Sequence, residues 1–107
     1  MTNFSDKERA EEAKYAFDEE MLFRVTARRN RLLGQWAAEK MGLSAEEAAS
    51  YAREVIQADF EEAGDEDVIR KVLGDLTAAG CEVEEAEIRA TLEAKHIEAR
   101  RSVIGEV

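Results

Sequence analysis

The sequence predicts an all-α protein, a four-helix bundle whose first helix is much longer than the others. The 107 residues include no proline, so nothing interrupts a helical hydrogen-bond ladder. Good helix formers such as Ala, Glu, Arg and Leu are abundant. Helix start and stop signals divide the chain into four segments, each with apolar residues at helical spacing. A chain of this length forms one domain with one modest core.

The first helix is expected to start at the capping box Ser5–Glu8 and to end at Gly42. At ~1.5 Å per residue it is a rod of about 55 Å, longer than its partners can cover. We therefore predict that residues 21–107 form the bundle and that residues 1–20 overhang it. An exposed helix is marginal in water, so the overhang is expected to be mobile until a partner covers it.

The direction of the apolar stripe also changes along this helix. Phe17 and Met21 share one face, and the stripe that includes Leu22 and Val25 lies about a quarter turn away. The second stripe is expected to face the bundle, with its core anchors at Leu32, Leu33 and Trp36. Gly34 in mid-helix costs ~1 kcal/mol relative to Ala, which indicates a bend or the close approach of another backbone.

Capping residues and glycines bound the other three helices. The second is predicted to run from the capping box Ser44–Glu47 to about Gly64, the third from the cap Asp65 to Gly80, and the fourth from about Val83 toward Ile104. The stripe expected on the fourth helix has residues spaced by sevens and others beside them: Val83, Ala90, Ile97 and Ile104, with Ile88, Leu92, Ala99 and Val103.

Charge alternates by block along the chain, whose net charge is −10. Residues 24–42 hold five basic side chains and one acidic, whereas residues 43–107 hold seven basic and seventeen acidic. The overall charge argues against nucleic acid and anionic membrane as primary partners. Because the N-terminus is polar and no apolar stretch is long enough to span a bilayer, we expect a cytoplasmic protein without membrane insertion.

The densest cationic cluster comprises Arg28, Arg29 and Arg31, next to a Leu/Trp face. Three roles remain open for it. The arginines can pair with the acidic second half of the chain, dock on an acidic patch of another protein, or bind the phosphates of a nucleotide.

No catalytic or metal-binding constellation is present in the sequence, so binding is favoured over catalysis and no cofactor is expected. The segment from Asp59 to Arg70 resembles a calcium loop only superficially, because Ala63 and Arg70 stand where oxygen ligands are required. His96 is expected to be a solvated surface residue. The single cysteine, Cys81, cannot form an internal disulfide.

Several segments resemble the zeta subunit family, the ATPase inhibitor of alphaproteobacterial ATP synthases. The most specific is Ala27-Arg-Arg-Asn-Arg-Leu-Leu-Gly-Gln-Trp-Ala-Ala38, supported by Phe4-Ser-Asp-Lys-Glu-Arg9, Glu12-Ala-Lys-Tyr-Ala16, Asp18-Glu-Glu20 and Gly64-Asp-Glu-Asp-Val68. The resemblance covers the whole chain and is densest over residues 4–42.

The resemblance implies a four-helix protein, monomeric when free, that inhibits ATP hydrolysis. Its N-terminal segment would fold as a helix into a catalytic αβ interface of the soluble ATPase sector and block the γ rotor. The partners would be the α, β and γ subunits, which place the bound protein at the periphery of the inner membrane. The residues implied to contact them are Phe4, Lys7, Arg9, Lys14, Tyr15, Phe17 and Asp18.

Two alternatives remain at this stage. In one, the bundle binds adenine nucleotide weakly through Arg28, Arg29 and Arg31 and thereby controls the N-terminal segment. In the other, the protein binds the ATPase as an assembly or scaffold protein without strong inhibition.

Overall fold

The computed structural model describes the backbone of residues 3–59 and 64–106 and the side chains of residues 18–59 and 64–106. It contains four helices: α1 (Asn3–Lys40), α2 (Ala45–Ala58), α3 (Glu66–Ala78) and α4 (Glu85–Glu106). The described residues include no strand. The predicted all-α four-helix class is confirmed.

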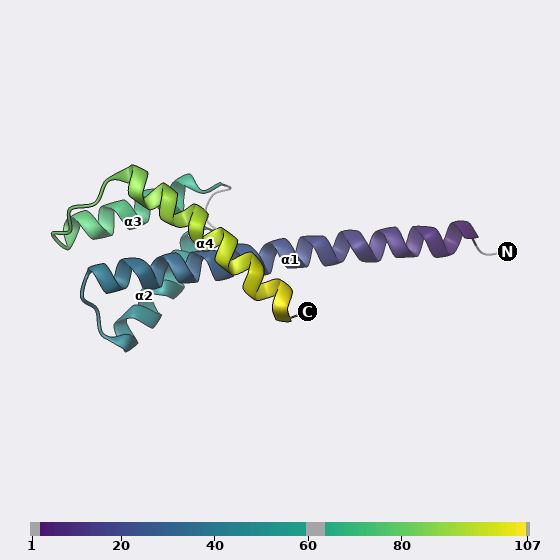
Figure 1. Ribbon diagram of the computed structural model, residues 1–107, viewed down its shortest axis with the longest axis horizontal. Helices are drawn as coiled ribbons and strands as arrows, with labels where there is room; N and C mark the ends of the chain where they lie inside the picture. Colours follow the sequence, from purple (N-terminus) through teal and green to yellow (C-terminus); the bar gives the residue numbers. More distant parts are fainter. Residues whose placement is uncertain (1–2, 60–63, 107) are drawn as a thin grey trace.

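One helix extends far beyond the other three. The molecule measures 67 × 24 × 21 Å, and the N-terminal part of α1 accounts for the long dimension (Figure 1). The other helices pack around the C-terminal part of α1, with α2 and α4 making its most extensive contacts. The C-terminus of α4 lies beside α1 near the point where α1 leaves the bundle. The predicted overhang is confirmed, whereas its mobility in the free protein stays a prediction.

Glycines in the left-handed region end α1 and α3, as predicted. Gly42 has φ 71° and Gly80 has φ 83°. Each is followed by a residue whose N–H reaches back to the last turn: Leu43 donates to the Ala38 carbonyl at 3.1 Å and Cys81 to the Leu76 carbonyl at 2.9 Å. These tight ends reverse the chain, so that consecutive helices can pack side by side.

The N-terminal caps follow the sequence signals only in part. The capping box of α2 is complete, because the Ser44 side chain accepts from the Glu47 N–H and the Glu47 side chain accepts from the Ser44 N–H. The predicted box at Ser5 is wrong, since α1 begins at Asn3 and Ser5 is already helical. Asp65 occupies the N-cap of α3 but makes no capping hydrogen bond. Helix α2 ends at Ala58, earlier than the predicted Gly64.

One main cluster forms the core. Leu33 and Ala37 of α1, with the apolar faces of α2, α3 and α4, are almost completely buried there. The main cluster is built on Leu33, Tyr51, Val55, Val68, Ile69, Val72, Leu76, Ile88 and Leu92. Burial of each large apolar side chain in this cluster stabilises the folded state by about 1.5–3 kcal/mol.

Two predicted apolar stripes are corrected. On α4, Ala90, Ile97 and Ile104 face outward, with Ile97 49% and Ile104 51% exposed, while Ile88, Leu92, Ala99 and Val103 are the buried face. Val83 precedes the helix and packs against the main cluster. Each set of residues falls on one side of the helix at its 3.6-residue period, and the side that is buried is the one on which Ala99 and Val103 pack against Val25 of α1. On α1, Leu22 is 62% exposed instead of facing the bundle.

Candidate functional site

The first candidate site is the overhanging part of α1, residues 3–17, hereafter the overhang. Its backbone is helical throughout, and it projects from the bundle as a single helix (Figure 1). Asp18, at its C-terminal end, is exposed. The side chains of the other six residues predicted to contact a partner lie outside the described residues: Phe4, Lys7, Arg9, Lys14, Tyr15 and Phe17.

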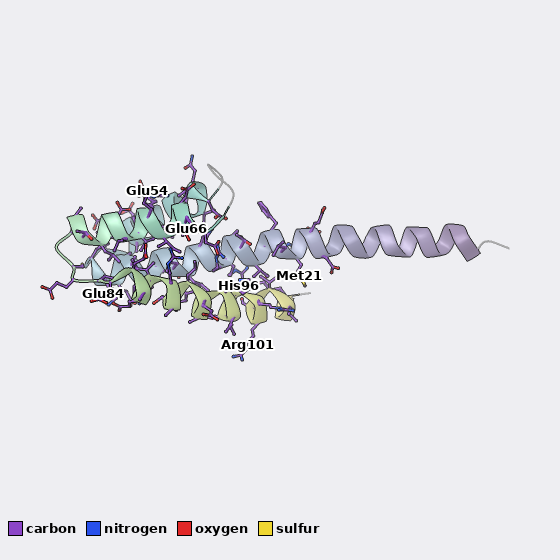
Figure 2. The ribbon with its side chains drawn as sticks, turned by 90° about the horizontal axis from the view of Figure 1, so that it is seen from above. Met21, Glu54, Glu66, Glu84, His96 and Arg101 are labelled. Atoms are coloured by element: carbon purple, nitrogen blue, oxygen red, sulfur yellow. The ribbon has the colours of Figure 1, made fainter. Side chains whose placement is uncertain are left out.

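A second, smaller apolar cluster fixes the place where the overhang joins the bundle. Val25 of α1 and Ala99 and Val103 of α4 are buried together, and Met21 and Leu32 pack against them. Figure 2 shows Met21 at the base of the overhang and His96 where α1 and α4 lie side by side. The last two turns of α4 therefore hold the first part of α1 that belongs to the bundle.

Arg28 adds a polar clamp to this cluster. Its Nη1 donates to the Ser102 hydroxyl at 2.5 Å and to the Glu106 carboxylate at 2.7 Å, and its Nη2 donates to the second Glu106 oxygen at 3.2 Å. The hydrogen bond from Arg28 lowers the pKa of Glu106, and the charges of Arg28, Arg24 and Arg31 act in the same direction. The same contact raises the pKa of Arg28. The C-terminal end of α4 is thus tied to α1 by a bidentate charged pair.

Arg29 points to the opposite side of the bundle, toward the two ends of the α2–α3 connection. Its Nη2 lies 3.0 Å from Asp65 Oδ1 and 4.0 Å from Asp59 Oδ1. The Arg29 side chain is 8% exposed, so it is nearly buried. The alignment is that of an ion pair and not of a hydrogen bond, because Nη2 has no hydrogen-bond acceptor among the described residues. Arg29 explains why Asp65 does not cap α3: its carboxylate faces the arginine.

Asn30 is also buried, at 1% exposure. Its Oδ1 accepts a hydrogen bond from Arg29 Nε at 3.1 Å, whereas its Nδ2 has no partner among the described residues. A small cavity of about 40 Å³ lies beside it, lined also by Thr26, Ile56 and Asp59. That volume is enough for one or two water molecules, the usual partners of a buried amide.

The structure therefore does not bring the three predicted arginines together. Arg28 binds α4, Arg29 binds the ends of the α2–α3 connection, and Arg31 is exposed and makes no hydrogen bond or ion pair with a described residue. The first two follow the interpretation in which arginines pair with the acidic second half of the chain. A single phosphate cradle of all three does not exist.

The three predicted core anchors differ in burial. Leu33 is completely buried, while Leu32 and Trp36 are partly buried at the edges of the two clusters. Lys40 lies over the Trp36 ring, with Nζ 5.1 Å from its centroid, which places the indole at the surface edge of the core.

An open cavity of about 490 Å³ lies between α1, α3 and α4, next to Arg29. Arg89 and His96 of α4 line it together with Asp65, Glu66 and Glu93. Arg89 is held there by two hydrogen bonds to the Glu66 carboxylate, at 3.0 and 2.8 Å, which lower the pKa of Glu66. His96 is partly buried on the wall of this open cavity, so it is less exposed than the predicted solvated surface residue.

Sequence reasoning missed Asn30, Arg89 and His96 as parts of these sites. A signal existed for Asn30, which shares the apolar face of α1 with Leu33 and Ala37 at helical spacing. For Arg89 and His96 the signal was weaker, because their neighbours come from helices distant in sequence. No group of three or more His, Cys, Asp or Glu side chains within residues 18–59 and 64–106 is arranged to hold a metal ion.

Comparisons with known proteins identify relatives of this chain. Residues 1–102 match the family described as ATPase inhibitor subunit zeta. A protein whose structure was solved by NMR in solution is 50% identical and superposes with a TM-score of 0.72, covering 81% of this chain and 99% of that protein. No curated protein matches the chain. Within the part of the chain that the structure describes, none of the helices is long and apolar enough to cross a bilayer.

Proposed function

This chain belongs to the ATPase inhibitor subunit zeta family, and we propose that it stops ATP hydrolysis by the soluble sector of a bacterial F-type ATP synthase. The overhang inserts as a helix into a catalytic αβ interface and blocks rotation of γ in the hydrolytic direction. The observation that carries this proposal is the shape of the molecule, a single helix projecting from a bundle about 24 Å across.

The shape suits a protein whose narrow helical end enters a crevice and whose wider bundle remains outside. A single helix is about 10–12 Å wide with its side chains, so it enters a crevice that excludes the bundle. An isolated helical segment is marginal in water, so the overhang gains its stability in the crevice, with Phe4, Tyr15 and Phe17 as apolar anchors. The protein then acts by occupying space and needs no catalytic group of its own.

The base of the overhang is built to resist displacement. Val25 is locked between Ala99 and Val103, and Arg28 is bound to Ser102 and Glu106. Because α1 is continuous from Asn3 to Lys40, a force on the overhang passes directly into this cluster. The bundle therefore stays on the outside of the enzyme and holds the overhang in the crevice. The α and β subunits border this crevice, and the overhang reaches toward the γ rotor.

Hydrolysis by the cognate soluble sector tests the proposal, with Phe17→Ala as the informative variant and Gln35→Ala, at an exposed position of the same helix, as its control. Phe17→Ala is expected to raise the concentration for half-inhibition about tenfold or more, since an apolar anchor at the centre of an interface contributes ~1.5–3 kcal/mol. Unchanged inhibition by Phe17→Ala contradicts the insertion mechanism. Binding by the wild type without inhibition supports the scaffold alternative instead.

A second candidate function is weak adenine-nucleotide binding in the cavity beside Arg29. The supporting observation is that two guanidinium groups and an imidazole, from Arg29, Arg89 and His96, line one cavity, and that a buried nitrogen of Arg29 has no hydrogen-bond acceptor among the described residues. The carboxylates of Asp65, Glu66 and Glu93 on the same walls oppose a polyphosphate, which limits the affinity.

Calorimetric and NMR titrations with ATP and ADP test this second candidate. Binding predicts amide shifts around residues 29, 89 and 96, and a weaker effect in Arg89→Gln. No heat and no amide shifts at millimolar nucleotide eliminate it.

A further inference from the structure

Four large apolar side chains among the described residues are exposed. They are Leu22 and Phe23 on α1, 62% and 57% exposed, and Ile97 and Ile104 on α4, 49% and 51% exposed. Val25, Ala99 and Val103, which are close to them in sequence, are buried between the same two helices. Leu22 therefore lies beside the contact between α1 and α4, whereas Ile97 and Ile104 lie on the outward side of the same part of α4.

The exposed side of α4 is apolar over several turns. At ~100° per residue, Ala90, Ala94, Ile97 and Ile104 lie on the side of α4 opposite its buried face, and all four are exposed. Helix α4 is therefore apolar on two opposite sides, and only one of these sides packs against the other helices of the bundle. An apolar stripe without a covering element is typical of an interaction surface.

Two arginines flank this stripe. Arg100 and Arg101 are exposed, and neither makes a hydrogen bond or an ion pair with any of the described residues. Figure 2 shows Arg101 on the side of α4 that faces away from α1. The chain has a net charge of −10, so these two guanidinium groups beside exposed isoleucines are opposite in sign to the chain as a whole. Arginine next to apolar side chains is a frequent hot-spot combination in protein interfaces.

A shallow groove joins the two helices on the same face. It has a volume of about 300 Å³ and lies between Leu22 and Asp18 of α1 and His96 and Arg100 of α4, with Met21 and Val25 at its base. Leu22, the groove, Arg100 and the stripe with Ile97 and Ile104 therefore form one continuous surface, which we name the α1/α4 face.

We propose that the α1/α4 face docks on an acidic, partly apolar protein patch of the ATPase sector, beside the opening that receives the overhang. This inference rests on the proposed function, because the overhang directs this end of the bundle toward the enzyme. Charge complementarity selects the chemistry of the patch: carboxylates opposite Arg100 and Arg101, and apolar side chains opposite Ile97, Ile104 and Leu22.

Docking through this face makes the attachment bivalent. Once the face is bound, the overhang is held at the crevice at an effective concentration in the millimolar range. A segment that must fold in order to bind then needs little affinity of its own. Both the face and the overhang contribute to the affinity, and only the overhang inhibits.

Hydrolysis and binding titrations of the full chain test the proposal, with Arg101→Glu compared with Arg53→Glu. Both arginines are exposed, both are without an ion pair to the described residues, and both substitutions change the net charge equally. Arg53 lies on α2, which packs on α1 and α3 and whose backbone does not come close to that of α4 among the described residues. Circular dichroism and the melting temperature establish that each variant is folded. A second variant, Ile97→Ser, probes the apolar part of the face.

The proposal predicts that Arg101→Glu and Ile97→Ser each weaken binding about tenfold, that saturating concentrations still inhibit fully, and that Arg53→Glu resembles the wild type. Wild-type affinity in both variants, or an equal loss in Arg53→Glu, overturns the α1/α4 face while leaving the proposed function intact. If the wild type binds without inhibiting, the proposed function fails and the same binding comparison still decides on the face. Absence of any binding by the wild type overturns both.

Discussion

Gly34 of α1 lies directly against the backbone of Ala52 of α2: a Cβ atom at residue 34 would stand 2.8 Å from the Ala52 Cα atom and 3.3 Å from Val55 Cγ2. Ala52 and Val55 are both buried, so neither can move aside without disturbing the core. This close approach was one of the two explanations that the sequence offered for a glycine in mid-helix. Because Gly34 has no side chain, the backbone of α2 can approach α1 closely at this point.

Gly34→Ala is therefore expected to destabilise the protein even though alanine is the better helix former. Overpacking costs about 1–3 kcal/mol, against a gain of ~1 kcal/mol in helix propensity. Gly74→Ala is the matched control, because Gly74 lies inside α3 and an added Cβ meets nothing within 4 Å. Thermal unfolding should show a lower melting temperature for Gly34→Ala and a slightly higher one for Gly74→Ala. A higher melting temperature in both variants contradicts the close contact.

Arg29→Met is expected to loosen the connection between α2 and α3. The substitution keeps the apolar stem but leaves Asp59, Asp65 and the Asn30 oxygen without their cation. Because the Asp65 side chain is 52% exposed, water offsets part of the loss, and we expect destabilisation of about 1–2 kcal/mol. Arg31→Met, at an exposed position, should change stability by less than about 0.5 kcal/mol. Urea unfolding of the two variants measures the difference, and equal midpoints would argue against a structural role for Arg29.

Acid should loosen the clamp at the end of α4. Arg28 lowers the pKa of Glu106 in the folded protein, so the folded state binds fewer protons than the unfolded state between the two pKa values. The stabilisation is present above the ordinary glutamate pKa of about 4.3 and is lost as pH falls through the folded pKa. The protection of the amides of residues 99–106, measured against the intrinsic exchange rate at each pH, should therefore fall in this acidic range. In Glu106→Gln their protection should be low already at neutral pH, and equal protection in both proteins at neutral pH would refute the clamp.

High pH should destabilise the folded protein through Tyr51. Its hydroxyl donates to Asp75 Oδ2 at 2.8 Å, and burial followed by this contact raises its pKa well above the ordinary value. The unfolded state loses its phenolic proton first, so the contribution to stability is full below about pH 10 and is lost as pH rises further. Tyr51→Phe should flatten the fall of stability above pH 10. Identical alkaline unfolding curves for the two proteins would show that Tyr51 is not the group responsible.

The sequence predicted those features that depend on local signals. The stops at Gly42 and Gly80, the capping box at Ser44 and the excess length of α1 follow from neighbouring residues. Features that depend on partners distant in sequence were not predictable in the same way. Arg29 faces Asp59 and Asp65, and Arg28 faces Glu106, although the two arginines are adjacent in the chain.

The fourth helix shows where a local pattern misleads. Its two sides carry comparable numbers of apolar residues, so periodicity alone cannot decide which side is buried. The choice is made by the fit of Ala99 and Val103 against Val25 of α1. The overhang is a different case, because all but one of the side chains predicted to bind a partner lie outside the described residues, and only binding to that partner can test them.

The most direct test of the account is ATP hydrolysis by the cognate soluble sector, titrated with the full chain and with a version lacking residues 1–20, while binding of each is followed in parallel. Both proteins are expected to bind, and only the full chain is expected to stop hydrolysis. Equal inhibition by the shortened protein, or binding of the full chain without any loss of hydrolysis, would contradict the assignment of the overhang as the inhibitory element.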